Sequence, residues 1–314
     1  MKAAVLQEPG VPENLKIVEI AKPDLQDTEV LVKVKAISIN PVDVKTRSGK
    51  ALYGQLKNEN PIIVGWDIAG EVTAVGKEVK QFKPGDAVFG MVNFPGHGKA
   101  YAEYVAAPAS HLALKPNDIT YQEAAATTLA ALTAWQVLVH IAGIKAGQKI
   151  FIQAAAGGVG HYAVQIAKHF GAYTIGTASM ANASFLQEIG LDEHIDYINQ
   201  DFTERAPDVD LFFDTLGAES VAKGINIVKD NGQVISILGG CNEEIQKKVE
   251  AAGIRTANYL VQSSGADMAQ LAQLLESGHL KAHVSHQFDF ENVAAAHRQV
   301  ETGKTRGKVV LNLP

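Results

Sequence analysis

The feature that most constrains the fold is a series of short apolar segments that alternate with helical stretches in the second half of the chain. The apolar segments are residues 150–152, 173–176, 194–197, 210–213, 234–238 and 257–261. A strand, a helix and a second strand in succession are typical of a parallel sheet, because the helix carries the chain back to the starting edge. Repetition of this unit predicts an α/β domain with a doubly wound parallel sheet.

The turn after the first apolar segment carries small residues at defined positions. Ala155, Gly157 and Gly160 occupy the three positions of the G-x-G-x-x-G pattern, and Gly158 and Val159 lie between the last two. Small residues permit a tight turn, let the backbone approach a pyrophosphate and let the next helix pack closely, while the helix N-terminus attracts phosphate. An ordinary strand-to-helix turn is the alternative, but the repeated strands and helices favour a Rossmann domain that binds a dinucleotide.

The end of the second apolar segment bears on which dinucleotide binds. An acidic residue there would bind the ribose 2′-hydroxyl of NAD and repel a 2′-phosphate. No acidic residue occurs between Gly176 and Glu188, so the sequence favours NADP(H). Ser179 and Asn182 are candidates for hydrogen bonds to the 2′-phosphate, although Ser179 fits a helix cap equally well and the segment contains no Lys or Arg.

The first part of the chain has a different pattern. Stretches rich in Val and Ile, such as residues 29–37, are broken by Gly, Pro and Asp, which is typical of strands and turns. At residues 120–139 a Thr with a Glu three positions later begins an Ala- and Leu-rich helical stretch, and we place a domain boundary there. We therefore expect a β-rich domain at residues 1–119, completed by 264–314, and the dinucleotide-binding domain at 120–263.

Composition and charge narrow the class of partner. A net charge of -6 with no block of basic residues argues against a nucleic-acid partner and favours a small-molecule ligand. The chain meets charge and proline before a signal-peptide core can form, and no apolar run has membrane-spanning length, so we expect no membrane span and a cytoplasmic location. Cys241 is the only cysteine, which excludes an internal disulfide and a four-thiolate zinc site within one chain.

Eight short motifs occur in order along the chain. They are Asn-Pro-Val-Asp at residues 40–43, Gly-Trp-Asp-Ile-Ala-Gly-Glu-Val at 65–72, Val-Gly at 75–76, Pro-Gly-Asp-Ala-Val at 84–88, Ala-Tyr-Ala-Glu-Tyr at 100–104, Leu-Thr-Ala at 132–134, Ala-Ala-Gly-Gly-Val-Gly at 155–160 and Gly-Lys-Val-Val at 307–310. Together they resemble the zinc-free quinone oxidoreductase branch of the medium-chain dehydrogenase/reductase superfamily. Within that branch, three segments resemble the chloroplast-envelope quinone oxidoreductase homologues and alkenal reductases: Thr177-Ala178-Ser179 with Asn182, Phe185-Leu186 and Ile195-Asp196-Tyr197. The resemblance implies a GroES-like β-rich catalytic domain plus a Rossmann domain, with the active site in the cleft between them.

The resemblance also bears on metal binding. Zinc alcohol dehydrogenases of the same superfamily carry a Cys near the position of Asn40 and a His at that of Trp66, and neither residue here is a usual zinc ligand. His279, His283 and His286 look like a metal signature, but they follow a helix end and enter a strand, so their rings need not converge. We expect no bound metal.

The resemblance further implies which residues contact NADP(H). Asn40 would lie beside the nicotinamide, Thr133 would approach the same region from the helix that opens the Rossmann domain, and Lys308 would close the groove from the last strand. The carboxyl ends of the parallel strands would line the rest of the groove. With the glycine-rich turn, the cofactor-binding candidates are Asn40, Thr133, Ala155, Gly157, Gly158, Val159, Gly160, Thr177, Ser179, Asn182, Leu216, Gly217, Leu238, Gly239, Val261 and Lys308.

The implied chemistry is hydride transfer to an electron-poor acceptor. Without zinc, no Lewis acid polarises an alcohol or a simple ketone, so we expect NADPH to reduce a quinone or the β-carbon of an α,β-unsaturated carbonyl compound. Asn40 and Tyr53 are the candidate catalytic residues, with Tyr53 as a donor to the developing enolate. An Asn-Pro turn, surface packing of Tyr53 and protonation by solvent are the alternatives. We interpret Asp43 and Asp67 as parts of a turn or a salt link.

Two other classes of function fit the same residues. One is an NADPH-binding or sensing protein with little catalysis, and the other is a zinc-dependent alcohol dehydrogenase with atypical ligands. The usual dimerisation of the superfamily through Rossmann sheet edges implies a homodimer, with residues 234–238 and 257–261 as candidates for the interface.

Overall fold

The computed structural model describes residues 1–314 and forms two units. Unit 1 comprises Met1–Leu132 and Val261–Pro314, and unit 2 comprises Thr133–Leu260. The first division lies later in the chain than residue 120, where we placed a boundary. The reason is that helix α3 (Tyr121–Ala126) packs on the sheet of unit 1.

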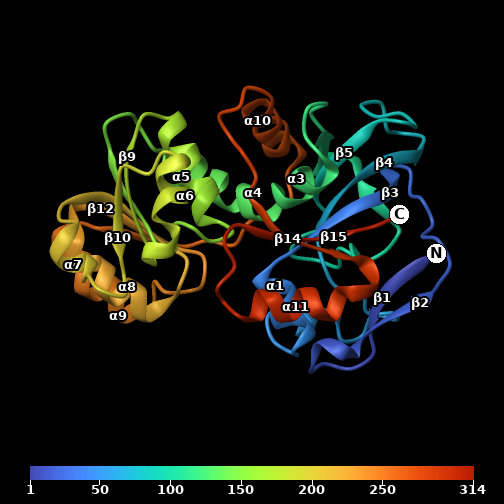
Figure 1. Cartoon of the computed structure of the whole chain (residues 1–314), viewed down its shortest axis with the longest axis horizontal. Helices are drawn as coiled ribbons and strands as arrows, with labels where there is room; N and C mark the ends of the chain where they lie inside the picture. The colour runs from blue at the N-terminus through green and yellow to red at the C-terminus, as the bar shows by residue number, and fades with distance from the viewer. The chain divides into compact units, whose positions relative to one another are not determined.

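Unit 2 contains a six-stranded sheet in which all the paired strands are parallel (Figure 1). Its strands are β8 (Lys149–Ile152), β9 (Tyr173–Ala178), β10 (Glu193–Asp196), β11 (Val209–Asp214), β12 (Val228–Ser236) and β13 (Arg255–Asn258). Their order is β10-β9-β8-β11-β12-β13, so the direction of winding reverses between β8 and β11. The predicted doubly wound parallel sheet is therefore confirmed. Sheets of this kind bind ligands at the carboxyl ends of the strands beside the reversal.

Helices cover both faces of the sheet in unit 2. They are α5 (Gly160–His169), α6 (Ala183–Glu188), α7 (Phe202–Arg205), α8 (Ala218–Gly224) and α9 (Glu243–Val249). Figure 1 shows α5 and α6 on one side and α8 and α9 on the other, as right-handed crossovers require when the winding reverses. Phe151 of β8 stacks on Phe212 of β11 with ring centroids 5.2 Å apart, so aromatic packing holds the two central strands together.

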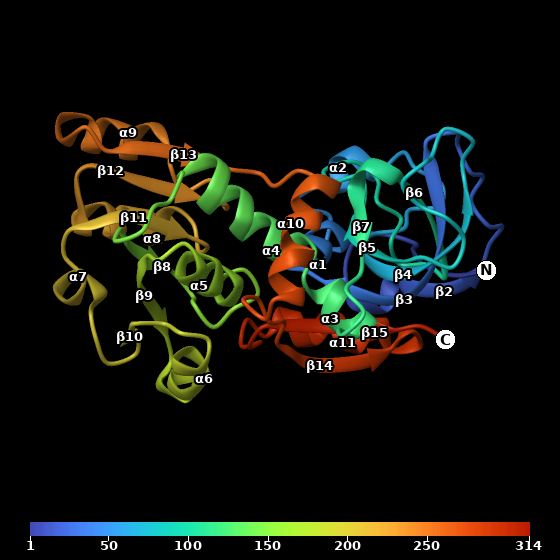
Figure 2. The same ribbon diagram turned by 90° about the horizontal axis from the view of Figure 1, so that it is seen from above.

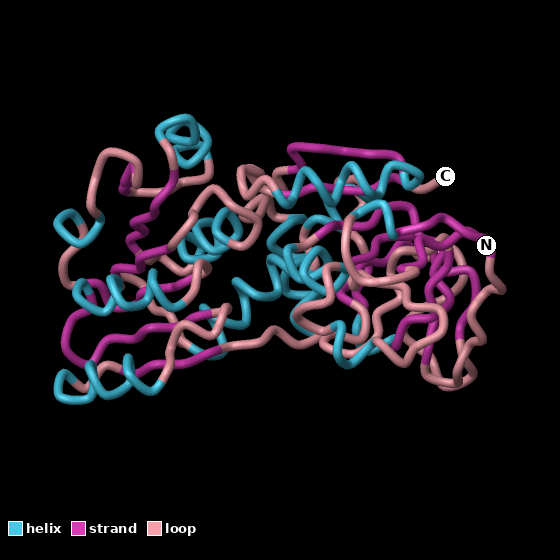
Figure 3. Tube along the Cα trace, turned by 90° about the horizontal axis from the view of Figure 1, so that it is seen from below, coloured by secondary structure: helices cyan, strands magenta, loops and turns pink.

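Unit 1 is rich in antiparallel strands, and Figure 3 shows its strands in magenta with long loops between them. The strands are β1 (Lys2–Leu6), β2 (Leu15–Glu19), β3 (Glu29–Ile39), β4 (Asp67–Val75), β5 (Ala87–Met91), β6 (Tyr104–Pro108), β7 (Leu112–Leu114), β14 (Val284–Asp289) and β15 (Lys308–Asn312). The main sheet has the order β14-β15-β3-β4-β5-β7, and β6 also pairs with β3. Because β15 pairs antiparallel with β3, Lys308 at the start of β15 lies beside Asn40, which follows β3.

The helices of unit 1 are short. Besides α3 they are α1 (Pro41–Arg47), α2 (Tyr53–Leu56), α4 (Leu129–Trp135, which continues into unit 2), α10 (Gly265–Glu276) and α11 (Val293–Glu301), several of which are labelled in Figure 2. The single helix predicted for residues 120–139 is interrupted after α3, where the hydroxyl groups of Thr127 and Thr128 donate hydrogen bonds to preceding backbone carbonyls. Such back-bonding often bends helices. No helix of the structure combines the length and apolar character needed to cross a membrane.

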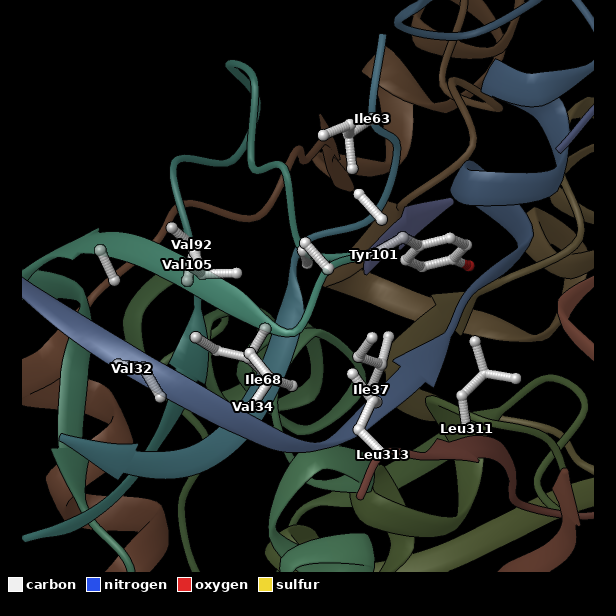
Figure 4. Close-up of a cluster of buried hydrophobic side chains, with 14 of the residues drawn as sticks. Val32, Val34, Ile37, Ile63, Ile68, Val92, Tyr101, Val105, Leu311 and Leu313 are labelled. Carbon is white, nitrogen blue, oxygen red and sulfur yellow. The ribbon is translucent and has the colours of Figure 1, made fainter. Parts of the chain in front are cut away.

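The apolar core of unit 1 lies against β3 and β4. Figure 4 shows Val32, Val34, Ile37 and Ile68 gathered in this cluster. Alternate residues of β3 are buried from Val30 to Ala36, which is the strand periodicity expected from the sequence, and the last three residues of the strand are all buried. Tyr101 is fully buried in the same cluster, so its hydroxyl group must find a polar partner inside the protein.

Candidate cofactor site and buried polar network

The turn after β8 can accommodate only glycine at position 160, the third glycine position of the G-x-G-x-x-G pattern. A Cβ atom on Gly160 would lie 2.3 Å from the Ala154 carbonyl oxygen and 2.7 Å from the Ala155 Cα atom. A Cβ atom on Gly176 of the neighbouring strand β9 would lie 2.5 Å from the Ala155 Cβ atom. The side chain of Ala155, the first small residue of the turn, therefore requires a glycine at position 176. The backbone therefore folds tightly at the start of α5, with the helix N-terminus close behind β8.

Side chains from two strands brace this turn. The backbone N–H of Ala154 donates to Thr177 Oγ1 over 3.1 Å, and the N–H of Ala155 donates to the Thr177 carbonyl oxygen over 2.9 Å. Thr177 also donates its hydroxyl hydrogen to Gln153, whose Nε2 in turn donates to Ser220 Oγ over 3.0 Å. Thr177 is one of the residues predicted from the sequence, whereas Gln153 and Ser220 are not. Their link runs between residues that are more than sixty positions apart, and no local motif marks it.

Ser179 and Asn182 lie together after β9. Ser179 has the backbone position of a helix cap, but its hydroxyl makes no capping hydrogen bond. Instead, Asn182 Nδ2 donates to Ser179 Oγ over 3.1 Å. The two polar groups therefore form one partly exposed pair at the end of the second strand.

The carboxyl ends of β11 and β12 are held by one buried carboxylate. Asp214 is fully buried and accepts hydrogen bonds from the N–H groups of Leu216 and Gly217 and from the hydroxyl of Ser236. Gly217 adopts a φ of +107° directly before α8, a conformation that favours glycine. Leu216 and Leu238 are 59% and 48% exposed, so each of these strand ends presents an apolar side chain.

A buried polar network lies in unit 1 around Asn40. Asn40 Nδ2 donates to Asp67 Oδ2 over 2.7 Å, and Lys308 Nζ donates to Asn40 Oδ1 over 2.5 Å. The Asp67 carboxylate also accepts from the backbone N–H of Leu129 over 3.0 Å. Asn40, Asp67 and Lys308 are each at most 3% exposed, so the structure brings together two of the predicted residues, Asn40 and Lys308, with an acid that we had interpreted as structural.

A second branch of the network leads away from the Asn40 backbone. Asp43 Oδ2 accepts from the Asn40 N–H over 2.9 Å and from the Tyr101 hydroxyl over 3.0 Å. The Tyr101 oxygen also lies 3.0 Å from His297 Nε2. Arg47, beside this branch, donates to the Gly10 carbonyl oxygen and to Glu301. None of Tyr101, His297 and Arg47 is among the site residues predicted from the sequence.

Burial perturbs the acid–base properties of these groups. Burial, together with the nearby Asp67, raises the pKa of Asp43 to about 7. Burial also raises the pKa of Asp67, although Lys308 and hydrogen bonds oppose this shift. Burial lowers the pKa of Lys308, against the attraction of Asp67 and Asp43, and lowers the pKa of His297 to about 3. Desolvation disfavours the charged form of each group, and the direct partners restore part of it.

The remaining predicted residues are more dispersed. Tyr53 begins α2, is half-buried and packs against the apolar core of unit 1. Thr133 is buried on α4, and Val261 is buried at the start of the second segment of unit 1. The polar side-chain partners of Asn40 are Asp67 and Lys308, so Tyr53 does not belong to the network.

Two positions correspond to those where zinc dehydrogenases of the superfamily carry ligands. At one of them Asn40 is hydrogen-bonded to Lys308, and at the other Trp66 Nε1 donates to the Gly96 carbonyl oxygen over 2.7 Å. In the structure, no group of three or more His, Cys, Asp or Glu side chains is placed to hold a metal ion.

Comparison with known proteins establishes the family. Residues 26–117 match the alcohol dehydrogenase GroES-like domain, and residues 189–311 match the zinc-binding dehydrogenase family. The 2-methylene-furan-3-one reductase of Solanum lycopersicum is 34% identical over 99% of this chain and 79% of its own length. The chain belongs to the medium-chain dehydrogenase/reductase superfamily. Within it, the relatives include quinone oxidoreductases and alkenal reductases, as the motifs predicted.

Two further relatives support this placement. The chloroplastic NADPH-dependent alkenal/one oxidoreductase of Arabidopsis thaliana is 34% identical over 99% of this chain and 79% of its own length. The structure of the quinone oxidoreductase from Coxiella burnetii has a TM-score of 0.94 at 34% identity and covers 100% of this chain and 99% of that one. The predicted combination of a GroES-like domain and a Rossmann domain is confirmed by these matches.

Proposed function

We propose that this protein is an NADPH-dependent reductase of quinones or α,β-unsaturated carbonyl compounds. The observation that carries the proposal is the close-packed turn at Gly160, placed at the winding reversal of a doubly wound sheet. A relative that is 34% identical over nearly the whole chain is an NADPH-dependent alkenal/one oxidoreductase, which supports the same cofactor and acceptor class.

The residues of unit 2 fit a dinucleotide. Between Ala155 and Gly160 only Val159 carries a side chain larger than a methyl group, and the α5 N-terminus offers N–H groups to a pyrophosphate. The pair of Ser179 and Asn182 would hydrogen-bond the 2′-phosphate. Bound NADPH would supply a hydride from C4 of its nicotinamide ring. The other proposed cofactor contacts are Asn40, Thr133, Gly157, Gly158, Val159, Thr177, Leu216, Gly217, Leu238, Gly239, Val261 and Lys308.

The residues of unit 1 would support reduction of the acceptor. A conjugated carbonyl compound gains negative charge on its oxygen when its β-carbon is reduced, and fixed N–H or O–H donors stabilise that charge. Asn40 is held in a buried network and carries amide N–H donors, and Tyr53 carries a phenolic donor. We therefore propose Asn40 and Tyr53 as the residues that contact the acceptor, with Asn40 in the more rigid setting.

Catalysis is proposed to proceed without zinc. Lys308 places an ammonium group on the amide oxygen of Asn40, and a cation at that distance opposes a second cation beside the same residue. Quinones and enones suit such a site, because they are electron-poor enough to accept a hydride without a Lewis acid.

Isotope labelling tests the proposed reaction. With NADPH that carries two deuterium atoms at nicotinamide C4 and a 2-alkenal as acceptor, we expect one deuterium at the β-carbon of a saturated aldehyde. Deuterium at the former carbonyl carbon would instead indicate a carbonyl reductase of the alcohol dehydrogenase type. If NADPH binds but neither the alkenal nor 1,4-benzoquinone is reduced, the protein is a binding or sensing protein.

A homodimer is proposed from the edge of the unit 2 sheet. β13 is the last strand of that sheet and pairs only with β12, so its other edge carries backbone groups that a second copy could pair with. Light scattering after size-exclusion chromatography should give twice the mass of one chain, and the mass of a single chain would contradict the proposal.

A cytoplasmic location is proposed from the sequence. Cys241 is the only cysteine and is buried, so folding needs no internal disulfide and suits a reducing compartment. Cell fractionation should recover the protein with cytoplasmic markers.

A further inference from the structure

The amide of Asn40 is held from both ends by groups of opposite charge. Lys308 Nζ is 2.5 Å from Oδ1, and Asp67 Oδ2 is 2.7 Å from Nδ2. A lysine ammonium can only donate hydrogen bonds, and an ionised carboxylate can only accept them. The two partners therefore fix which end of the amide carries oxygen and which carries nitrogen, a choice that an isolated asparagine leaves open.

The partners of the two charged groups support these charge states. Asp67 accepts from the backbone N–H of Leu129 over 3.0 Å and from Asn40 Nδ2 over 2.7 Å, and both of these groups are donors. Lys308 Nζ also lies 3.4 Å from the Ile39 carbonyl oxygen, an acceptor. Each group thus faces partners that suit its ionised form.

One N–H of the Asn40 side-chain amide is left to bind a substrate. Nδ2 of Asn40 carries two hydrogens, and the bond to Asp67 uses one of them. Asn40 is 1% exposed and its backbone N–H is bonded to Asp43, so neither the amide nor its backbone can turn freely. The second N–H of the amide consequently points in one direction.

We propose that Asp67 and Lys308 are positioning residues that clamp the Asn40 amide in a single orientation and aim its second N–H at the oxygen of the acceptor. This inference rests on the proposed function for its chemistry. The clamp itself consists of hydrogen bonds among residues of unit 1. These hydrogen bonds can be tested in protein that is not turning over substrate.

A double-mutant cycle tests the functional part. We expect Asn40→Ala to lower kcat about 100-fold, as the loss of an oxyanion donor does. Lys308→Met and Asp67→Asn should each lower kcat about 10-fold, as loss of an orienting partner does. In the Asn40→Ala background, neither change should lower kcat further, because the clamp acts through Asn40. Equal effects in both backgrounds would overturn the proposal.

Conservative and matched variants separate positioning from stability. Lys308→Arg keeps a cationic donor and should recover most of the activity that Lys308→Met loses. Asp192→Asn breaks a Lys168–Asp192 ion pair of 2.8 Å elsewhere in the protein, and it should leave kcat unchanged. If Asp67→Asn fails to fold, the cycle with Lys308→Met decides the question.

Side-chain NMR tests the clamp without catalysis. In protein labelled with ¹⁵N-asparagine, the Asn40 amide signal is assigned by its absence in Asn40→Ala. We expect one of its two protons to lie far downfield and to exchange slowly with solvent, because it is bonded to a carboxylate. Lys308→Met should reduce that separation. An unchanged Asn40 signal in Lys308→Met would refute the clamp.

The two tests distinguish failure of the clamp from failure of the proposed function. Wild-type protein that reduces neither quinone nor alkenal, yet shows the expected Asn40 signal, would overturn the function and the aiming of the N–H but leave the clamp standing. Active wild-type protein with an additive mutant cycle and an unchanged signal would refute the clamp alone.

Discussion

The glycine-rich turn of unit 2 is built from backbone, whereas the Asn40 network of unit 1 is built from buried side chains. The turn depends on the absence of a Cβ atom at Gly160, which leaves the strand and helix free to meet. The network depends on Asp67 and Lys308, whose charged forms burial disfavours and which are both hydrogen-bonded to Asn40.

This contrast explains how differently the two regions respond to change. A site made of backbone fails when any side chain is added, and neighbouring residues cannot easily adjust. A site made of charged side chains fails when one partner is removed, because the other is left buried without compensation. Substitutions in one region at a time therefore separate the two kinds of site.

The largest effect is expected from Gly160→Ala. The added Cβ atom would lie 2.3 Å from the Ala154 carbonyl oxygen, so the turn must open. We expect the free energy of unfolding to fall by roughly 2–3 kcal/mol and NADPH binding to weaken. Urea denaturation and fluorescence titration measure the two effects. Gly54→Ala is the control, since nothing lies within 4 Å of its added Cβ atom. Equal stability of both variants would contradict the close packing of the turn.

Asp214→Ala should have a somewhat smaller effect on the same unit. It removes the acceptor for two backbone N–H groups and the Ser236 hydroxyl, and leaving buried donors unpaired costs about 1–3 kcal/mol. We expect reduced stability and a weaker affinity for NADPH, because the loop at Leu216 loses its anchor. Unchanged NADPH affinity would show that this loop does not contact the cofactor.

The buried titratable groups of the Asn40 network predict that the free energy of unfolding depends on pH. The glycine-rich turn contains no titratable side chain and predicts no such dependence. His297 has a pKa of about 3 in the folded protein against 6.5 for an ordinary histidine, so between these values the unfolded chain binds the extra proton. The free energy of unfolding should therefore decrease on acidification below pH 6.5. Urea denaturation at several pH values should show a shallower decrease in His297→Gln. Parallel curves would contradict a buried neutral His297.

Asp43 contributes with the opposite sign. Its pKa of about 7 in the folded protein exceeds the ordinary value of 3.8, so the folded state holds the extra proton between these values. Its contribution to stability is lost as the pH rises from 3.8 to 7. Asp43→Asn should therefore steepen the acid-side decrease that His297 causes, and the same denaturation series measures it.

The smallest effect is expected from Ser179→Ala. Its hydroxyl accepts a single hydrogen bond from Asn182 and is partly exposed, so the loss of one contact with a 2′-phosphate should weaken NADPH binding by about 1 kcal/mol. NADH binding should not change. If both cofactors were affected equally, Ser179 would not discriminate between them.

The sequence predicts one of these regions far better than the other. Ala155, Gly157 and Gly160 lie within six positions, and their spacing between an apolar strand and a helix predicts the turn, because its physics is local. The alternation of strands and helices likewise predicts the parallel sheet. By contrast, the single helix expected at 120–139 is interrupted, since the hydroxyls of Thr127 and Thr128 compete for backbone carbonyls.

The polar network could not be predicted from spacing. Lys308 and Asn40 are 268 positions apart and meet because β15 pairs with β3. The resemblance to known reductases indicated Asn40 and Lys308 separately, but nothing in the sequence joined either of them to Asp67. Partners of a buried charge are set by tertiary packing, which leaves no periodic pattern in the chain.

The central claim is reduction of a conjugated acceptor by NADPH without zinc, and steady-state oxidation of NADPH in the presence of a chelator tests it most directly. We predict turnover of 1,4-benzoquinone or a 2-alkenal that the chelator does not change, with slower turnover of NADH and none of a simple aldehyde. Aldehyde reduction that the chelator abolishes would contradict the account.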